Sequence, residues 1–349
     1  MKAPFVWFGG KRRVAPEVWA ALGDVPNYIE PFAGSLAVLL GRPHDMSDGT
    51  RRAETVNDAD GFLANFWRAL AHDPEAVAHW CDWPVNEVDL FARHLWLVNT
   101  GRSRLLEGME ADPDFYDAQV AGWWVWGVNA WIGSGWCSGD GPWVDTGDGI
   151  GKRPHLGNAG QGVKRKLPHL GTAGQGVNRQ LPHLGDAGRA GYNNMEYRPN
   201  VLGYFEELAG RLRDVRVCCG DWSRVCTSGA MSYGSKVGVF LDPPYLGDVR
   251  TADLYAVDDH TIAHAVRDWC LEHGDDPRLR IVLAGYRAEH DDLMPDTWRR
   301  HYYSASAAYS TTESAARQDG NHANRANEVL WFSPHCVTPD RQGELWEAL

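Results

Sequence analysis

Short apolar runs alternate with helical patterns along much of this chain. The clearest run, Val237–Leu241, is apolar and rich in β-branched residues, which is typical of a buried strand. It stops at Asp242-Pro243-Pro244-Tyr245, where two prolines cannot continue a sheet ladder. The end of this strand therefore presents an acid, a rigid loop carbonyl and an aromatic ring. Because ligands bind beyond the carboxyl ends of the strands in open α/β sheets, we expect the functional site there.

A strand, a tight turn and a helix are predicted near the start of the chain. Tyr28–Ser35 is followed by the apolar Leu36–Leu40, which indicates the first unit of a doubly wound sheet. The turn lacks the G-x-G-x-x-G pattern, so a dinucleotide fingerprint is absent. A single glycine, Gly34, favours a smaller adenosine-type ligand.

A second strand is predicted from Glu54, and it ends at the acid Asp58. An acid at the end of the second strand is well placed for ribose hydroxyls. The alternative is a helix cap, which Asp58 or Asp60 could also supply.

An apolar run ends in a glycine pair and a base at Gly9-Gly10-Lys11. Glycine lets the backbone approach a ligand closely, and Lys11 could then reach an anionic group. An ordinary Gly-Gly turn is the other interpretation.

Residues 73–136 are predicted to be helical, over Pro74–Trp83, Glu87–Val98 and Phe115–Trp131. The last segment contains four tryptophans and Asn129. Since it is apolar on most faces, a buried helix is favoured over a platform for stacking. Asn129 or an aromatic residue there could contact a nucleic acid at the edge of the domain.

Residues 151–190 contain a repeat with a 14-residue period, in which Pro-His-Leu-Gly occurs three times. Its glycine and proline exclude regular helix, and its apolar residues are too sparse for a solenoid core. No carboxylate or cysteine accompanies the histidines, so we predict no metal site. The repeat is either a flexible basic arm lying along DNA or a low-complexity duplication within a hairpin.

Alternating strands and helices are predicted again after residue 200. The predicted elements are a helix over Val201–Leu212, a strand over Val215–Cys219 followed by Asp221, a helix over Asp259–His273, and strands over Arg280–Gly285, Arg299–Ser306 and Glu328–Phe332. The predicted fold class is therefore α/β, a doubly wound Rossmann-like sheet with a mostly helical insertion that carries the Gly/Pro-rich basic repeat. We predict one domain from residues 1–72 and 200–349, interrupted by an insertion over 73–199 with helices at 73–136 and the repeat arm at 151–190.

Composition and charge narrow the possible partners. With 349 residues, 44% hydrophobic and 23% charged, the chain is expected to be an ordinary soluble protein of about two domains. It has no apolar run long enough for a membrane span, and its seven cysteines without C-x-x-C spacing fit a reducing compartment, so a cytoplasmic location is expected. The net charge of −12 argues at first against a nucleic-acid partner. Residues 151–200, however, hold eight bases against two acids, which fits contact with phosphates.

Five short motifs together resemble a known family. They are Trp7-Phe8-Gly9-Gly10-Lys11, Ile29-Glu30-Pro31-Phe32-Ala33-Gly34, Asn57-Asp58, Asp242-Pro243-Pro244-Tyr245 and Asn327-Glu328-Val329-Leu330. In their order and spacing, over roughly residues 4–75 and 200–335, the chain resembles the Dam-type (DPPY, alpha-group) adenine-specific DNA methyltransferases, which use S-adenosylmethionine. The middle of the chain resembles that family only in layout, as a helical target-recognition region followed by a hairpin.

The resemblance and the residue patterns together give a set of expected site residues. The expected catalytic residues are Asp242, Pro243, Pro244 and Tyr245. The expected cofactor-binding residues are Trp7, Gly10, Lys11, Glu30, Pro31, Phe32, Gly34, Asp58, Asp221 and Asp242. The expected contacts with double-stranded DNA are Asn129, Lys152, Arg153, Lys164, Arg165, Lys166 and Arg179.

Two positions depart from the family pattern. Leu36 stands where the family often has a second glycine, and Val6 stands where some members carry a lysine that reads DNA. The GATC specificity of the best-known members is therefore not carried over. The layout would suit a modification enzyme of a phage or mobile element, with or without a partner restriction enzyme.

The DPPY loop predicts a mechanism for methylating adenine. The adenine amino group is a poor nucleophile inside a duplex, so the base must be flipped into a pocket. Asp242 and the Pro243 carbonyl can accept its two hydrogens while Tyr245 stacks on the ring, without a cysteine nucleophile or a metal. The alternatives are methylation of cytosine N4, of a protein glutamine or of RNA adenine, or a catalytically inactive DNA-binding relative.

Overall fold

The computed structural model describes residues 1–5, 7, 9–43, 49, 51–131, 136–137, 143–145, 150–152, 201–244, 262–303 and 328–338. These residues form two compact units, each described below by itself. The first unit takes its described residues from the start of the chain and from Asp58–Gly220. The second takes them from Trp7–Asn57, Asp221–Asp248 and Asp259–Leu349.

A seven-stranded, mostly parallel sheet is the centre of this mixed α/β fold, which is consistent with a Rossmann-like methyltransferase. The strands are β1 (Asn27–Glu30), β2 (Ala53–Asp58), β5 (Val215–Cys219), β6 (Val237–Leu241), β7 (Leu279–Tyr286), β8 (Arg299–Tyr303) and β9 (Glu328–Phe332). Their order is β5-β2-β1-β6-β7-β9-β8. β1 pairs in parallel with β2 and β6, β6 pairs in parallel with β7, and β9 runs antiparallel to both β7 and β8.

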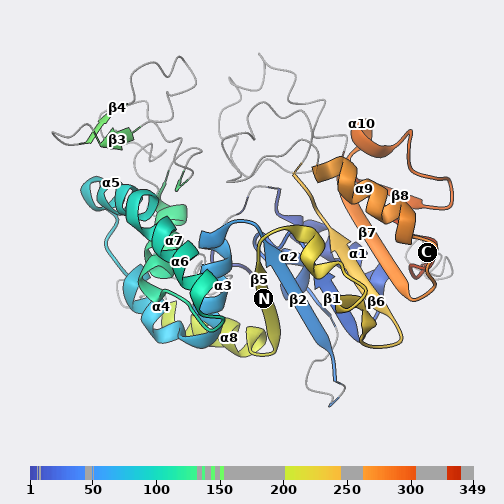
Figure 1. Cartoon of the computed structure of the whole chain (residues 1–349), viewed down its shortest axis with the longest axis horizontal. Helices are drawn as coiled ribbons and strands as arrows, with labels where there is room; N and C mark the ends of the chain where they lie inside the picture. The colour runs from blue at the N-terminus through green and yellow to red at the C-terminus, as the bar shows by residue number, and fades with distance from the viewer. Residues whose placement is uncertain are drawn as a thin grey trace, which may run out of the picture. The chain divides into compact units, whose positions relative to one another are not determined.

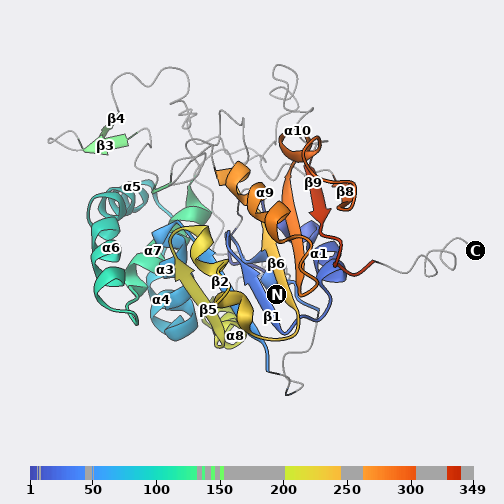
Figure 2. The same cartoon turned by 45° about the vertical axis from the view of Figure 1, so that its right-hand side comes forward.

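Helices of the second unit cover both faces of the sheet. The helical segments of this unit are η1 (Lys11–Arg13), α1 (Ala15–Leu22), α2 (Ala37–Leu40), η5 (Trp222–Val225), η6 (Ala230–Ser232), α9 (Ile262–His273) and α10 (Arg287–His290). Figures 1 and 2 show α1 and α9 on opposite sides of β6 and β7. Leu22 and Val25 lie against Gly238 of β6, so α1 covers the face to which Gly238 belongs. This is the doubly wound arrangement.

The first unit is mainly helical. Its helices are α3 (Gly61–His72), α4 (Pro74–Cys81), α5 (Glu87–Trp96), α6 (Arg102–Ala111), α7 (Ala118–Ala130) and α8 (Val201–Leu212), with the π-helix η2 (Leu97–Gly101) between α5 and α6. β3 (Trp143–Asp145) and β4 (Ile150–Lys152) form an antiparallel hairpin. Side-chain caps begin α3, α4, α5 and α7, as expected for Asp and Asn at those positions.

Aromatic side chains fill the core of this helical unit. Phe5 packs against Phe66, Trp67 and Trp124, with ring centroids 5.3–5.6 Å apart. Trp124 is 2% exposed, which confirms that α7 is a buried helix. Burial of such large rings is the main source of stability in a unit of this kind.

The structure corrects several expected boundaries. The helix expected over Glu87–Val98 ends at Trp96 and continues as η2, and α7 begins at Ala118 rather than Phe115. α6 has no counterpart among the predicted helices, because only Leu105 of its side chains is buried and no apolar stripe marks it. The repeat over 153–190 lies outside the described residues.

Candidate active site

β1 and β6 are neighbours at the point where the strand order reverses. The chain continues from β1 to β2 on one side of this point, and from β6 to β7 on the other. Crossovers that diverge in this way leave a crevice beyond the strand ends, where ligands bind in open α/β sheets. Glu30 is the last residue of β1, and Asp242 follows the last residue of β6.

The strand register places three acids on one face of this edge. The pairs that establish the register are Tyr28 with Gly238, Phe240 with Val282, Val282 with Phe332, and Tyr286 with Glu328. Because side chains alternate along a strand, Glu30 and Glu328 share the face of Phe240, and Asp242 follows β6 onto that face. It is the same face that α1 covers.

Lys11 places a cation at this edge. Its ammonium lies 3.0 Å from Oδ1 of Asp242 and donates a 2.8 Å hydrogen bond to the carbonyl oxygen of Gly9. The Lys11 side chain is 5% exposed and that of Asp242 is 20% exposed. The pair is therefore mostly shielded from water, while the carboxylate still reaches the surface.

Glu328 lies within electrostatic range of this pair. Burial raises the pKa of its carboxyl, Lys11 and the neighbouring Tyr303 side chain lower it, and Asp242 raises it. Glu328 is 6% exposed and begins β9, where Tyr303 of β8 is its direct cross-strand partner. Glu328 stands within the motif Asn327-Glu328-Val329-Leu330, but no role was predicted for it. An acid at the first position of a strand was the available signal.

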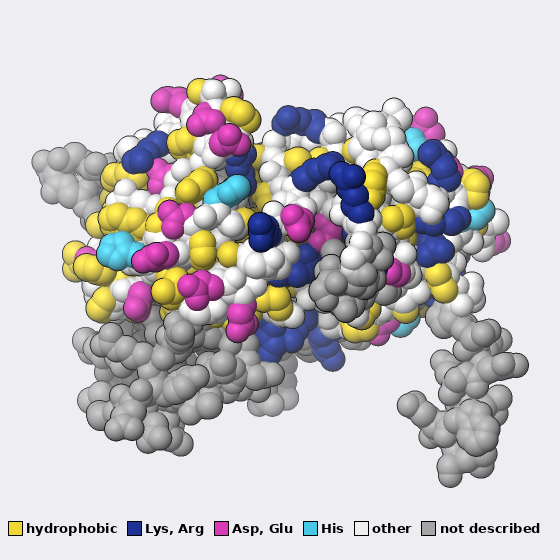
Figure 3. Space-filling model, turned by 90° about the horizontal axis from the view of Figure 1, so that it is seen from below, with side chains coloured by type: hydrophobic (Ala, Val, Ile, Leu, Met, Phe, Trp, Pro, Cys, Tyr) yellow, Lys and Arg dark blue, Asp and Glu magenta, His cyan; other side chains and the backbone are white. Residues whose placement is uncertain are grey.

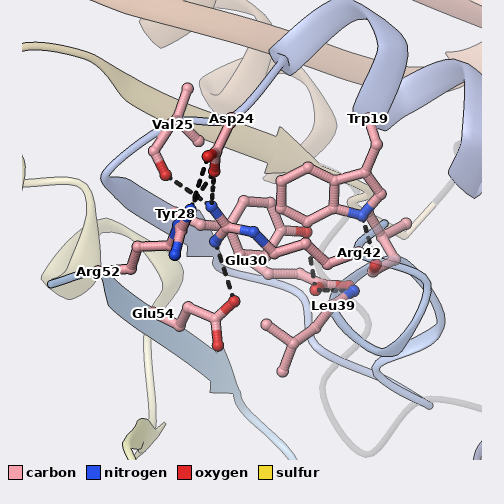
Figure 4. Close-up of polar contacts among 10 residues, drawn as sticks. Trp19, Asp24, Val25, Tyr28, Glu30, Leu39, Arg42, Arg52 and Glu54 are labelled. Atoms are coloured by element: carbon pink, nitrogen blue, oxygen red, sulfur yellow. Dashed lines mark hydrogen bonds and ion pairs between the residues drawn. The ribbon is translucent and has the colours of Figure 1, made fainter. Parts of the chain in front are cut away.

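Glu30 is buried beneath the same edge. Its Oε2 accepts hydrogen bonds from the Tyr28 hydroxyl at 2.9 Å and from the Leu39 amide at 3.3 Å (Figure 4). The pKa of Glu30 is raised to about 8. Burial is the largest cause, the two hydrogen bonds oppose it, and the negative charges of Asp242 and Glu54 add to it. The carboxyl is therefore held in the neutral form near pH 7 and fixes the start of α2.

A network of ion pairs supports the strands below Glu30. Arg42 reaches Glu54 at 3.0 Å and Asp24 at 2.9 Å, and Arg52 reaches the other oxygen of Asp24 at 2.7 Å (Figure 4). The Arg42 guanidinium also lies 4.8 Å from the centre of the Trp19 ring. These contacts hold β1, β2 and α2 together away from the crevice.

The turn after β1 has an unusual backbone. Gly34 has φ +46°, and a Cβ there would lie 2.9 Å from Nε1 of Trp7, so only glycine fits. Leu36 is also left-handed, with φ 53° and ψ 29°, and its side chain is fully buried. The position where the family often has glycine thus requires a conformation that costs other residues roughly 1–2 kcal/mol. Leu36 keeps that conformation with its side chain in the core.

Several expected cofactor residues lie around this turn. Phe32 stacks on Trp222, with centroids 6.2 Å apart, and Asn57 donates a 3.1 Å hydrogen bond to the carbonyl of Pro31. Gly10 donates its amide to the carbonyl of Trp7 at 3.2 Å. Asp221 caps η5 by accepting from the Ser223 amide at 2.9 Å. The loop after β5 that carries Trp222 therefore lies beside the turn after β1.

Asp58 and Asp60 accept different backbone hydrogen bonds at the end of β2. Asp60 caps α3 by accepting from the Phe62 and Leu63 amides, at 2.8 and 3.4 Å. Asp58 accepts from the Asp60 amide at 2.9 Å. Asp60 is therefore the helix cap, and binding of a ribose by Asp58 stays a prediction.

The residues expected to contact DNA are only partly described. Asn129 is 6% exposed, and its amide donates to the carbonyls of Pro4 and Val125, so it is used within the helical unit. Lys152 ends β4. Arg153, Lys164, Arg165, Lys166 and Arg179 lie outside the described residues, as does Tyr245. On the face in Figure 3, acidic, basic and hydrophobic side chains of the described part are interspersed.

Within the described part of the chain, no cluster of His, Cys, Asp or Glu is arranged to hold a metal ion. None of its helices is long and apolar enough to cross a membrane.

Comparison with known proteins gives a family match for the first part of the chain. No curated protein matches the chain significantly. Residues 7–85 match the family model of the D12 class N6 adenine-specific DNA methyltransferases. The matched region contains Lys11, Glu30 and the turn at Gly34, so it covers the β1 side of the site. This match supports a DNA adenine methyltransferase enzyme.

Proposed function

We propose that the protein transfers a methyl group from S-adenosylmethionine to the N6 amino group of an adenine flipped out of double-stranded DNA. The observation that carries this proposal is the position of Asp242. It follows the central strand β6 at the switch point, 20% exposed, with its carboxylate held 3.0 Å from Lys11. The D12 family match covers the strand beside it.

The residues present fit the cofactor. When bound, S-adenosylmethionine would supply an electrophilic methyl group on a positively charged sulfur. The edge of the sheet suits a cation, because Asp242 presents a carboxylate there and the carboxyl group of Glu328 lies on the same face. The half-buried ring of Phe32 offers an apolar surface to an adenosine, and Gly34 lets the backbone of the turn come close. Trp7, Pro31, Asp58 and Asp221 complete the proposed cofactor set.

The chain's own residues prepare the amino group for attack. An exocyclic amine conjugated to a ring has little lone-pair density on nitrogen. In this proposal Asp242 and the carbonyl of Pro243 accept its two hydrogens, which favours a tetrahedral nitrogen aimed at the methyl group. Hydrogen bonds to an ionised acceptor are the stronger kind, and Pro243 and Pro244 make the loop rigid. Tyr245 is proposed to stack on the flipped base.

Recognition of DNA is assigned to the insertion. We propose that residues 73–199 form the target-recognition region and that the basic segment within 151–190 contacts phosphates. Its eight bases against two acids over 151–200 support this assignment.

The proposal is tested by replacing the acceptor. Asp242→Asn keeps the shape of the side chain but removes its charge, so we expect methyl transfer to DNA to fall at least about 100-fold. Transfer of a tritiated methyl group to DNA measures this, and the exposed Asp292→Asn is the matched control. Thermal unfolding should show that both variants fold, with a lower melting temperature for Asp242→Asn because the shielded Lys11 ammonium loses its charged partner. Full activity in a folded Asp242→Asn protein would exclude the mechanism.

The methylated product identifies the substrate. Digestion of the product DNA and mass spectrometry of the nucleosides are expected to show N6-methyladenine. N4-methylcytosine, or methylation of RNA alone, would contradict the proposal.

A further inference from the structure

Glu328 is a buried acid beside the proposed catalytic pair, and neither the sequence motifs nor the family match gives it a role. We propose that Glu328, supported by Tyr303, is a positioning residue that shares the charge of Lys11 with Asp242. This division lets Asp242 turn an oxygen toward the amino group of the target base. The inference rests on the proposed function and deepens it.

The sheet delivers Glu328 to the site from a distant part of the chain. It begins β9 and lies between Tyr286 of β7 and Tyr303 of β8 as the direct cross-strand partner of each. Its side chain therefore points to the face that carries Asp242. Directly opposed side chains on one face are close enough to contact each other, so the flanking strands fix the position of the carboxylate.

The charges around Lys11 explain why a second acid matters. The ammonium is 5% exposed, 3.0 Å from Asp242, and close enough to Glu328 to lower that carboxyl's pKa. A buried ammonium with one partner would attract that partner strongly, since little water screens the pair. A second carboxylate divides the attraction. Asp242 is then a better acceptor, and Lys11 remains in place.

The carboxylate of Glu328 is itself anchored. Tyr303, its direct cross-strand partner on β8, lowers the pKa of the Glu328 carboxyl and so favours its charged form, against the cost of burial. Tyr303 thus acts through Glu328, and its hydroxyl can be removed without removing a charge. This provides a second, milder variant.

The test separates the chemical step from cofactor binding. For Glu328→Gln we expect kcat to fall about tenfold while the Kd for S-adenosylmethionine, measured by calorimetry, changes less than about threefold. Glu328→Asp, which restores the charge on a shorter chain, should recover part of kcat. Tyr303→Phe should lower kcat by a smaller factor.

A buried acid outside the site supplies the matched control. Glu54 is 3% exposed and pairs with Arg42 at 3.0 Å. Glu54→Gln should lower the melting temperature and leave kcat per folded molecule unchanged. If Glu328→Gln behaves in the same way, its role is structural and the inference is wrong. If Glu328→Gln does not fold, an unchanged kcat in Tyr303→Phe overturns the inference.

A crystal structure of Glu328→Gln gives a result that does not depend on activity. We expect the Lys11 ammonium to approach both oxygens of Asp242 in the variant, and an unchanged Lys11 position would contradict the inference. Wild-type protein that transfers no methyl group to DNA would overturn the proposed function alone. An active wild type with a fully active Glu328→Gln variant would overturn this inference alone.

Discussion

The carboxyl edge of the sheet and the tryptophan-rich helical unit both bury a cation, but they do so differently. At the edge, Lys11 meets the carboxylate of Asp242. In the helical unit, Arg93 is 8% exposed and its guanidinium lies 4.3–5.1 Å from the centres of three tryptophan rings, those of Trp83, Trp123 and Trp126. One cation is held mainly by charge and the other mainly by ring faces.

The difference indicates in which region a side chain can exchange a contact within the protein for a contact with a ligand. A carboxylate that reaches solvent can give up part of its contact with Lys11 when a ligand arrives. Trp126 is 1% exposed and Trp123 is half-buried, while Trp83 is 47% exposed. Cation–π contacts and packing therefore stabilise a fixed arrangement of Arg93 at the boundary of the core. We therefore expect changes in the helical unit to affect stability, and changes at the edge to affect ligand binding and chemistry.

Close packing of α7 on α4 gives the largest expected effect on stability. A Cβ at Gly122 would lie 2.4 Å from Cβ of Trp80 and 2.8 Å from the carbonyl oxygen of Val77, so the two helices would have to separate. For Gly122→Ala we expect a loss of about 1–3 kcal/mol in unfolding free energy, measured in urea, because overpacking outweighs the gain in helix propensity. The kcat per folded molecule should not change.

A second helical glycine provides the control for this variant. Gly210 of α8 has open space where its Cβ would lie, so Gly210→Ala should stabilise the protein by roughly 0.5–1 kcal/mol. If both variants stabilise the protein, the packing of α7 is looser than described. If Gly122→Ala lowers kcat in the folded protein, the two regions are not separable in function.

Gly34 tests the edge in the same way, with a smaller cost in stability. Alanine would combine φ +46° with a contact of 2.9 Å to the Trp7 indole. We expect Gly34→Ala to cost about 1–2 kcal/mol in unfolding free energy and to weaken binding of S-adenosylmethionine in a calorimetric titration. Gly229→Ala is the control, because Gly229 has a helical φ of −64° and its Cβ would contact only Thr227 at 3.8 Å. Unchanged cofactor affinity in Gly34→Ala would remove the turn from the proposed site.

Local patterns predicted much of the sheet. The bounds of β5, β6 and β9 agree with those expected, because each is a short apolar or β-branched run with clear ends. Asp242 was found because it follows an apolar strand, and ligands bind beyond the carboxyl ends of strands in open α/β sheets. That inference needs only the sequence near the strand and one general rule of topology, whereas Glu30 was expected at the site only from the family resemblance.

Long-range pairing and backbone strain could not be predicted. The place of Glu328 depends on the antiparallel pairing of β9 with β7 and β8, which joins segments far apart in the chain. The sequence showed only that Leu36 departs from the family pattern. Its left-handed backbone in the fold explains why glycine is often found at that position. Asn129 looked available for DNA, but its contacts with Pro4 and Val125 are visible only in the folded unit.

The smallest expected effect is a change in how stability depends on pH at Glu30. In the folded protein its pKa is about 8, above the ordinary value of 4.5 that applies when the chain unfolds. As the pH rises from about 5 to about 8, the unfolded chain releases this proton while the folded protein keeps it, so the group makes the protein less stable. Glu30→Gln removes this loss of stability with rising pH and keeps a hydrogen-bond acceptor for Tyr28 and Leu39. We expect the variant to gain stability relative to the wild type across this range in urea unfolding. If the difference in unfolding free energy between Glu30→Gln and the wild type does not vary between pH 5 and pH 8, Glu30 is ionised in the folded protein. A buried negative charge would then lie beneath the Lys11–Asp242 pair.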